Sequence, residues 1–573
     1  MMRKILFLMI LPFMLAACGR DDVDDAVIAE DETVPPAVAV TDETDVETHQ
    51  ALFERIDADA IYLLANLQPL PDDLVDLFWE PMEALGDLNR QTYGQMAEAA
   101  DSESPLAATF LREIGEIDSR AAWEARGLHS NGLWAVHSLG LFPIVHWQLS
   151  DSSAFEATLE RLAADADTEL PRRDIGGEQI IWTSVDDLGL AIHYDEHFAT
   201  LALVPDDEAI LRRVANLDRP ETALDAGTLA GFNRTRGFTP HGSGYMDFTT
   251  LLERLLSDDD PYIEAARNAL DLDDWTEDPA CRTELEALTG FFPRFSGGMT
   301  QADQSAVSFT MRLETEAGLA ARLAQIAQTP MGLDHGSAGM LSAGLTLDLI
   351  AARDLAREFV AGWVDNPPEC ELFANIRDNA AEWQLALNRP IPPVVTNIHG
   401  FRMQLDSLTM EGAGNFTDAS GMLAVFMRQP QMLIGMAQMF SPELAELNLQ
   451  PGGDPQPMPP GMIPDMPELD AWIAISDGAI GLAVGEEFRD RLTGALEAAD
   501  PDSAVLGYTI NMKGYGAFME QMMEQAMAEF EDMEEEAPPA DFLKKLGEYY
   551  EESHLSIHLT ENGIDFISTV TMP

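Results

Sequence analysis

Apolar and polar residues alternate along many short segments of the chain, and these segments predict β-strands. Residues 555–559 alternate strictly, which is typical of a half-buried antiparallel strand because successive side chains point to opposite faces. Asn562-Gly563 follows as a predicted hairpin turn, and residues 564–570 form the predicted returning strand. Between such strands, apolar residues recur every three or four positions, which predicts helices. The pattern therefore predicts an α+β fold of mostly antiparallel strands backed by helices.

The predicted elements occur in the same order in two halves of the chain. Each half opens with a strand and a helix, and later has a hairpin, a helix, a strand leading into a helix, a further helix and a closing hairpin. In the first half these segments are 61–67, 74–79, 190–194, 198–204, a helix capped by Asp206, 244–248 with the helix after it, 281–292, 295–300 and 306–313. In the second half they are 341–347, 355–363, 472–475, 480–484, a helix with Phe488, Leu492 and Leu496, 507–512 with the helix after it, 541–550, 555–559 and 564–570. Strands 472–475 and 480–484 are joined by a predicted type I′ turn at Asp477-Gly478. We therefore predict an internal duplication, with a first half at 51–330 and a second half at 331–573.

The first residues have the three regions of an export signal. Arg3 and Lys4 supply positive charge, residues 5–14 are apolar, and residues 15–18 end in Cys18. The apolar run is too short to span a bilayer of about 30 Å. Residues 1–19 resemble the signal peptide and lipobox of bacterial lipoproteins. The resemblance implies cleavage after residue 17, acylation of Cys18 and attachment to a membrane of the cell envelope; the alternative is an ordinary secretory signal with a chance cysteine.

The residue after the predicted lipidated cysteine is Gly19 and not an aspartate. In the enterobacterial members of the family, this implies transport to the outer membrane instead of retention in the inner membrane. From Cys18 to about Gln50 the chain is rich in Asp and Glu and has no aromatic residue. Such a segment cannot bury enough apolar surface to order itself. We therefore predict that 18–50 is an acidic, disordered tether with a reach of roughly 30 Å or more.

The net charge of the chain excludes several partners. The 573 residues contain 100 Asp and Glu against 33 Lys and Arg, a formal net charge of −67. Nucleic-acid binding is excluded because phosphate contacts need clustered basic residues. An anionic membrane surface repels such a body, so attachment comes from the lipid. The acidity is spread along the chain, which favours adaptation to high salt over a dedicated cationic partner.

The remaining cysteines are Cys281 and Cys370, and in an oxidising envelope compartment they predict one disulfide. The alternative is two buried free thiols. A metal site is disfavoured, because neither cysteine has another Cys or a His nearby at ligand spacing.

Methionines and histidines are the candidate metal ligands. Two groups of methionines have helical spacing, which fits Cu(I) binding but fits core packing better: Met432, Met436 and Met439, and Met519, Met522, Met523 and Met527. His193 and His197 flank Asp195-Glu196, a possible zinc site that a surface turn explains better. The acidic runs 258–260 and 271–274 lack the spacing of a calcium-binding EF-hand loop. We therefore nominate no metal ligand and no cofactor.

Short catalytic motifs are missing from the sequence. Ser243 lies in residues 241–244, which lack the spacing of a hydrolase nucleophile elbow, and neither glycine-rich phosphate-binding motif occurs. The sequence thus favours a non-enzymatic binding or scaffold lipoprotein whose partners are the membrane, through its anchor, and an envelope protein or ligand of unknown identity. The alternatives are a periplasmic hydrolase using a carboxylate or metal-bound water, and a Met/His metal-binding protein.

Overall fold

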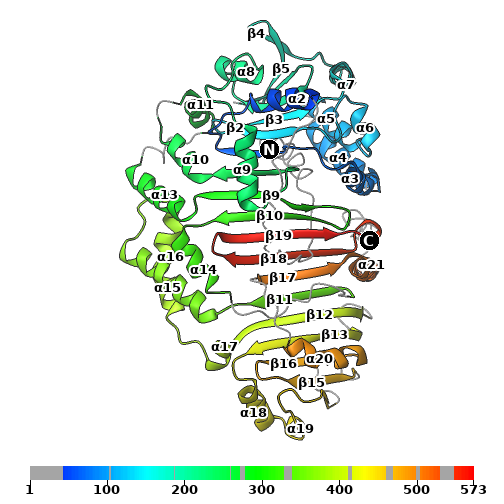
Figure 1. Cartoon of the computed structure of the whole chain (residues 1–573), viewed down its shortest axis with the longest axis vertical. Helices are drawn as coiled ribbons and strands as arrows, with labels where there is room; N and C mark the ends of the chain where they lie inside the picture. Colours follow the sequence, from blue (N-terminus) through cyan, green and yellow to red (C-terminus); the bar gives the residue numbers. More distant parts are fainter. Residues whose placement is uncertain are drawn as a thin grey trace. The chain divides into compact units, whose positions relative to one another are not determined.

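The computed structural model describes residues 43–573, except 85, 102–104, 186–187, 258–259, 271–277, 328–338, 411–415, 460–468, 498–503 and 530–546. The described residues form two compact units, and each is described by itself. Unit 1 comprises residues 43–304 with 309–311, and unit 2 comprises 305–308 with 312–573. Both units combine helices with antiparallel strands (Figure 1), which confirms the predicted α+β class.

Unit 1 is built on an antiparallel sheet in the order β9-β8-β1-β2-β3-β7-β6-β5-β4. Its strands are β1 (Tyr62–Ala65), β2 (Trp134–Leu139), β3 (Phe142–Gln148), β4 (Arg172–Ile175), β5 (Glu178–Val185), β6 (Leu188–Tyr194), β7 (Phe198–Val204), β8 (Ser243–Asp247) and β9 (Arg294–Ala302). Its helices are α2 (Glu43–Phe53), α3 (Asp72–Ala84), α4 (Gly86–Asp101), α5 (Pro105–Gly115), α6 (Arg120–Glu124), α7 (Ser152–Asp165), α8 (Glu208–Val214), α9 (Ala226–Arg236), α10 (Phe248–Leu255), α11 (Pro261–Leu270) and α13 (Pro279–Phe291).

Helices bury apolar residues on both faces of the unit 1 sheet. On one face Ile210 and Leu211 of α8 pack against Ala202 and its neighbours. On the other face Phe155 of α7 packs against Ile192. Strand β7 lies between these two helical layers and is buried from both sides, and accordingly it is apolar at nearly every position.

Unit 2 has an antiparallel sheet in the order β10-β19-β18-β17-β11-β12-β13-β16-β15-β14. Its strands are β10 (Ala306–Glu314), β11 (Leu341–Thr346), β12 (Ile398–Met410), β13 (Phe416–Met427), β14 (Gln456–Pro457), β15 (Ala471–Ile475), β16 (Ala479–Val484), β17 (Ala504–Asn511), β18 (Glu552–Thr560) and β19 (Gly563–Thr571). Its helices are α14 (Ala317–Ala324), α15 (Leu349–Asp365), the 3-10 helix η1 (Glu371–Phe373), α16 (Ala374–Leu387), α17 (Pro393–Asn397), α18 (Pro430–Phe440), α19 (Pro442–Ala445), α20 (Glu486–Glu497) and α21 (Met512–Glu529).

The two units share a strand order. In each, the first strand after the opening helix (β1 or β11) lies between the second strand (β2 or β12) and the strand that follows the hairpin and helix (β8 or β17). Beyond the second strand, both sheets continue with β3 or β13, then the hairpin β7-β6 or β16-β15. A common strand order is what an internal duplication requires, and the duplication itself stays a prediction.

The limits of the described units differ from those of the predicted segments. The first half was predicted to end at residue 330, whereas α14 and both ends of β10 belong to unit 2. The tether was expected to reach residue 50, but α2 begins at Glu43, because Leu52 and Phe53 at its end are buried in the core.

Two local predictions were wrong in detail. The turn at Asp477-Gly478 is not type I′, since neither residue has a positive φ; instead the Ser476 hydroxyl accepts a hydrogen bond from the Gly478 amide at 3.2 Å. Helix α8 is capped by Asp207, whose carboxylate accepts from two backbone amides, while Asp206 pairs with Arg173.

Candidate functional site

The sheet of unit 2 has one apolar face that is only partly buried and an opposite face that is more buried, polar along some strands and apolar along β13, β15 and β16. We define the apolar face by alternate residues of seven neighbouring strands. None of these residues is fully buried. These residues are Leu341, Ala343, Leu345, Phe401, Met403, Leu405, Leu423, Val425, Ile480, Leu482, Leu506, Tyr508, Ile510, Leu555, Ile557, Leu559, Ile564 and Phe566.

Cross-strand register joins these side chains into continuous rows. Tyr508 lies opposite Ala343, which in turn lies opposite Met403. Met403 lies opposite Leu423 on the next strand. Directly opposed residues of antiparallel strands have side chains on the same face about 5 Å apart, so the row is an unbroken apolar strip. A second row through Leu345 and Phe401 runs beside it.

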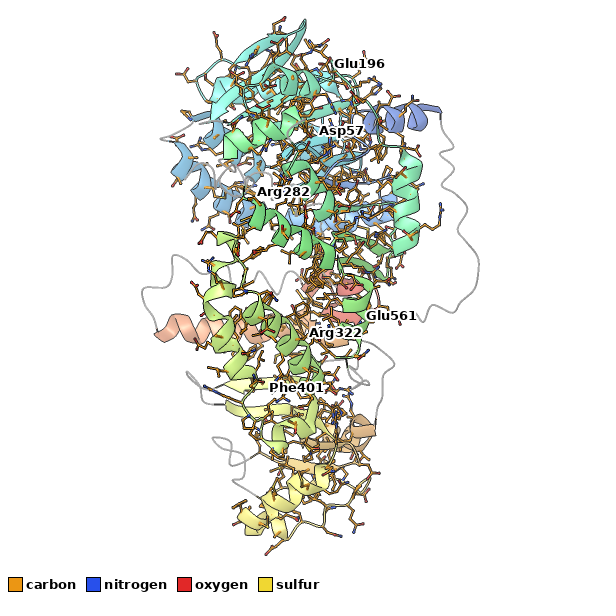
Figure 2. The ribbon with its side chains drawn as sticks, turned by 90° about the vertical axis from the view of Figure 1, so that its left-hand side faces the viewer. Asp57, Glu196, Arg282, Arg322, Phe401 and Glu561 are labelled. Carbon is orange, nitrogen blue, oxygen red and sulfur yellow. The ribbon has the colours of Figure 1, made fainter. Side chains whose placement is uncertain are left out.

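The most exposed members of the apolar face lie in its central strands. Phe401 (labelled in Figure 2) and Leu423 are each 38% exposed, and Tyr508 is 36% exposed. Fully burying such a side chain is worth roughly 1.5–3 kcal/mol, so each leaves a substantial part of that stabilisation unrealised. A half-exposed apolar sheet of this width is typical of a surface that binds an apolar partner.

The opposite face is buried, and along β12 and β17–β19 it carries polar residues, whereas along β13 and β16 it is an apolar core. Arg402, Gln404, Thr509, His554 and Asp565 are all less than a tenth exposed. Hydrogen bonds hold three of them: the Thr509 hydroxyl lies 2.9 Å from His554 Nδ1, and Arg491 donates to the Gln404 side-chain oxygen at 3.2 Å.

An ion pair completes this buried polar face. Arg312 donates from Nε and Nη2 to both oxygens of Asp565, each at 2.6 Å. The neighbouring carboxylate raises the pKa of the Arg312 guanidinium. Helix α20 lies over the β13–β16 part of this face (Figure 1). There Leu492 and Leu496 pack on Gly481.

Exposed apolar side chains concentrate in unit 2. In the described part of the chain, unit 2 holds most of the large apolar side chains that are more than a third exposed: Leu372, Trp383, Leu385, Val395, Phe401, Leu423, Met432, Met439, Phe440, Tyr508 and Met522. Unit 1 holds Met82, Met246, Leu288, Phe291 and Met311. The contrast places the candidate binding surface in unit 2.

Unit 1 contains a buried row of histidines on one face of its sheet. His146 lies opposite Thr200, and Thr200 lies opposite His193, so the three side chains share a face. His146 Nδ1 is 2.9 Å from the Thr200 hydroxyl, and its Nε2 is 3.1 Å from Nε2 of His137. Burial lowers the pKa of His137 to about 4 and, together with the His137 charge, holds the pKa of His146 well below its ordinary value.

His193 and the carboxylates near it line a cavity of about 390 Å³ at the end of β6. His193 Nε2 lies 3.9 Å from a Glu178 oxygen, and burial lowers the pKa of His193. Burial alone would raise the pKa of Asp195, but Arg55 at 2.6 Å and the backbone amides of the turn bring it below its ordinary value. Among the described residues, no three His, Cys, Asp or Glu side chains converge as metal ligands.

The other residues singled out from the sequence are dispersed. Cys18 lies outside the described residues, as do parts of the acidic runs 258–260 and 271–274. Cys281 and Cys370 are buried and disulfide-bonded. The packing interpretation is wrong for Met432 and Met439, which are 41% and 74% exposed, because α18 presents them to solvent.

No protein-family model, curated protein or solved structure matches the chain. Within the described ranges, none of the helices combines the length and apolar character needed to cross a bilayer. The site therefore rests on its own geometry.

Sequence reasoning missed the apolar face, although the signal was present. The strand 398–410 alternates between Phe401, Met403 and Leu405 on one side and Arg402 and Gln404 on the other. Alternation indicates which residues share a face, but it does not indicate which face the helices cover.

Proposed function

We propose that the protein is a non-enzymatic lipoprotein of the bacterial cell envelope that binds acyl chains on the apolar face of unit 2. In this proposal Cys18 is acylated, the acidic segment after it tethers the body to a membrane, with the outer membrane favoured, and the ligand is a lipid or another acylated molecule. The observation that supports the acyl-chain site is the half-exposed apolar face, which lies opposite the more deeply buried face of the same sheet.

The chemistry of the face favours alkyl chains. Its backbone N–H and C=O groups are paired within the strand ladders. Among the residues that define the face, Tyr508 alone has a polar group, and Ser553 and Ser568 lie at its border, opposite Ile510 and Leu555. An extended polypeptide brings backbone groups that need hydrogen-bond partners, and this surface has none to offer. An acyl chain brings no such groups, and each methylene that it buries contributes about 0.8 kcal/mol.

A fluorescent fatty acid titrated into the purified protein tests the proposal. The parent protein should bind the probe, and Leu423→Glu and Phe401→Glu should each weaken binding at least tenfold, because a charge on this face must be desolvated when the chain binds. Both positions are 38% exposed, so the glutamates should be tolerated in the folded protein. Circular dichroism checks that they are.

The matched control is Leu385→Glu on α16, a position that is 70% exposed and lies off the sheet. It should leave probe binding unchanged. Equal binding by the parent and both sheet variants would refute the acyl-chain site. Protein-dependent release of fatty acid from an ester-linked probe would refute the non-enzymatic part of the proposal.

The anchor is tested separately by mass spectrometry of the mature amino terminus. The proposal expects acylated Cys18 as the first residue, in the membrane fraction. An intact signal peptide on cytosolic protein, with no fatty acid, would refute it.

A further inference from the structure

Helix α18 in unit 2 presents an uncharged, apolar surface to solvent. Although 23% of all residues of the chain are charged, the stretch 429–442 contains no charged residue. Met432 and Met439 lie two turns apart on one face of the helix and are 41% and 74% exposed, and Phe440 beside them is 86% exposed. These are among the most exposed large apolar side chains in the described part of the chain.

Helix α17 extends this surface. Residues 390–398 also lack charge, and Val395 in α17 is 41% exposed. The two segments lie together, because the Arg428 amide donates to the Asn397 carbonyl at 2.9 Å and the Asn397 side chain donates to the Gln429 carbonyl at 3.4 Å. We call Val395, Met432, Met439 and Phe440 the apolar patch.

The surroundings of the apolar patch indicate what it contacts. Charges resume at its borders, where Arg428 pairs with Asp348 at 3.2 Å and Glu443 follows α18. A second copy of the chain is disfavoured as the occupant, because two bodies of net charge −67 repel each other. A lipid bilayer repels the acidic surfaces in the same way but accepts an uncharged apolar helix at its interface.

The size of the patch fits the bilayer interface and not a membrane span. Helix α18 has 11 residues, so it is about 16 Å long at 1.5 Å per residue, half the thickness of the hydrocarbon core. Methionine and phenylalanine bring no polar group that must be satisfied in lipid. A weak interfacial contact suffices if an acyl anchor already holds the chain at the membrane, because the local concentration of bilayer is then high.

We infer that the apolar patch of α17 and α18 inserts into the interface of a lipid bilayer and orients the anchored protein on its membrane. This inference rests on the proposed anchoring through Cys18 but not on the proposed acyl-chain site, since no residue of the apolar patch belongs to the apolar face of the sheet.

Vesicle flotation of the mature chain, residues 18–573 with Cys18→Ser, tests the inference without an acyl anchor. The parent should float with phosphatidylcholine vesicles, and the double variant Met439→Asp/Phe440→Asp should lower the bound fraction at least tenfold. The matched control, Leu372→Asp/Leu385→Asp, changes positions that are 55% and 70% exposed on η1 and α16. It should float like the parent.

A second measurement tests the inference even if the patch variant fails to fold. Phe440→Trp keeps the site apolar, and its added fluorescence should be quenched by lipids brominated on their acyl chains, relative to the parent. Equal flotation of parent and patch variant, equal loss in the control, or no quenching of Trp at 440 would each overturn the inference. Binding of the fatty-acid probe by the patch variant should be unchanged, which separates this failure from failure of the proposed function.

Discussion

Acidification should destabilise unit 1 through the paired histidines of β2 and β3. His137 and His146 are 2% and 3% exposed, their rings are stacked, and their Nε2 atoms are 3.1 Å apart. One ring can donate to the other only if the second is neutral. Protonation of both would place two cations in contact at a buried position, with Arg213 adding a further unfavourable charge.

The size of the effect follows from the pKa of His137. In the unfolded chain the pKa is near 6.5, and in the folded chain burial lowers it to about 4. Because the folded pKa is the lower one, the stabilisation is complete above pH 6.5 and is lost as the pH falls toward 4. The loss for His137 alone is about 2 kcal/mol at pH 5 and about 3 kcal/mol below pH 4. His146, whose pKa is also lowered, adds a loss of the same sign.

Urea unfolding at pH 7 and pH 5 measures this loss. The variant His137→Gln keeps a hydrogen-bonding side chain next to His146 but removes one titrating group, so it should lose about 2 kcal/mol less than the parent between these pH values. The contribution of the carboxylates to the pH-dependent loss of stability is the same in both proteins, so it cancels when one loss is subtracted from the other. His197→Gln, at the half-buried β6–β7 turn, is the control and should behave like the parent. Equal losses in the parent and His137→Gln would refute the reasoning.

Two further predictions concern stability. Arg312→Leu should destabilise unit 2 by about 3 kcal/mol in urea unfolding, because it leaves the Asp565 carboxylate, which is 6% exposed, buried without its partner. The double variant Arg312→Leu/Asp565→Leu should recover most of this loss. A double variant no more stable than the single one would contradict the argument. The denatured, unreduced mature protein should show no free thiol from Cys281 or Cys370, and labelling of either by a thiol reagent would contradict the disulfide.

The order of elements could be predicted from the sequence because it depends on local periodicity. The strand predicted at 198–204 matches β7, and the hairpin predicted at 555–570 matches β18 and β19. The long strands β12 and β13 were not predicted, although their alternation is visible. Their polar positions are Arg402 and Gln404, residue types that sequence patterns place on a solvated surface, whereas here they are buried.

The histidine pair could not be predicted for a different reason. His137 and His146 are nine residues apart and meet only because β2 and β3 form a hairpin in which Ala135 lies opposite His146. A shift of one residue in this register would turn one ring to the other face of the sheet. The sequence alone does not specify that register, nor which helices close over the histidine row.

The two sheets differ in how far their faces are covered, and this difference favours a binding role for unit 2. In unit 1, helices bury apolar residues on both faces of the sheet, as stability alone would favour. In unit 2, the strands bury Arg402, Thr509 and Asp565 and leave an apolar face half-exposed, an arrangement that costs stability on both counts. The shared strand order does not require this difference, because the sheet of unit 1 has helices packed on both of its faces. The apolar face is therefore best explained by a ligand that covers it, and changes there should alter binding more than folding.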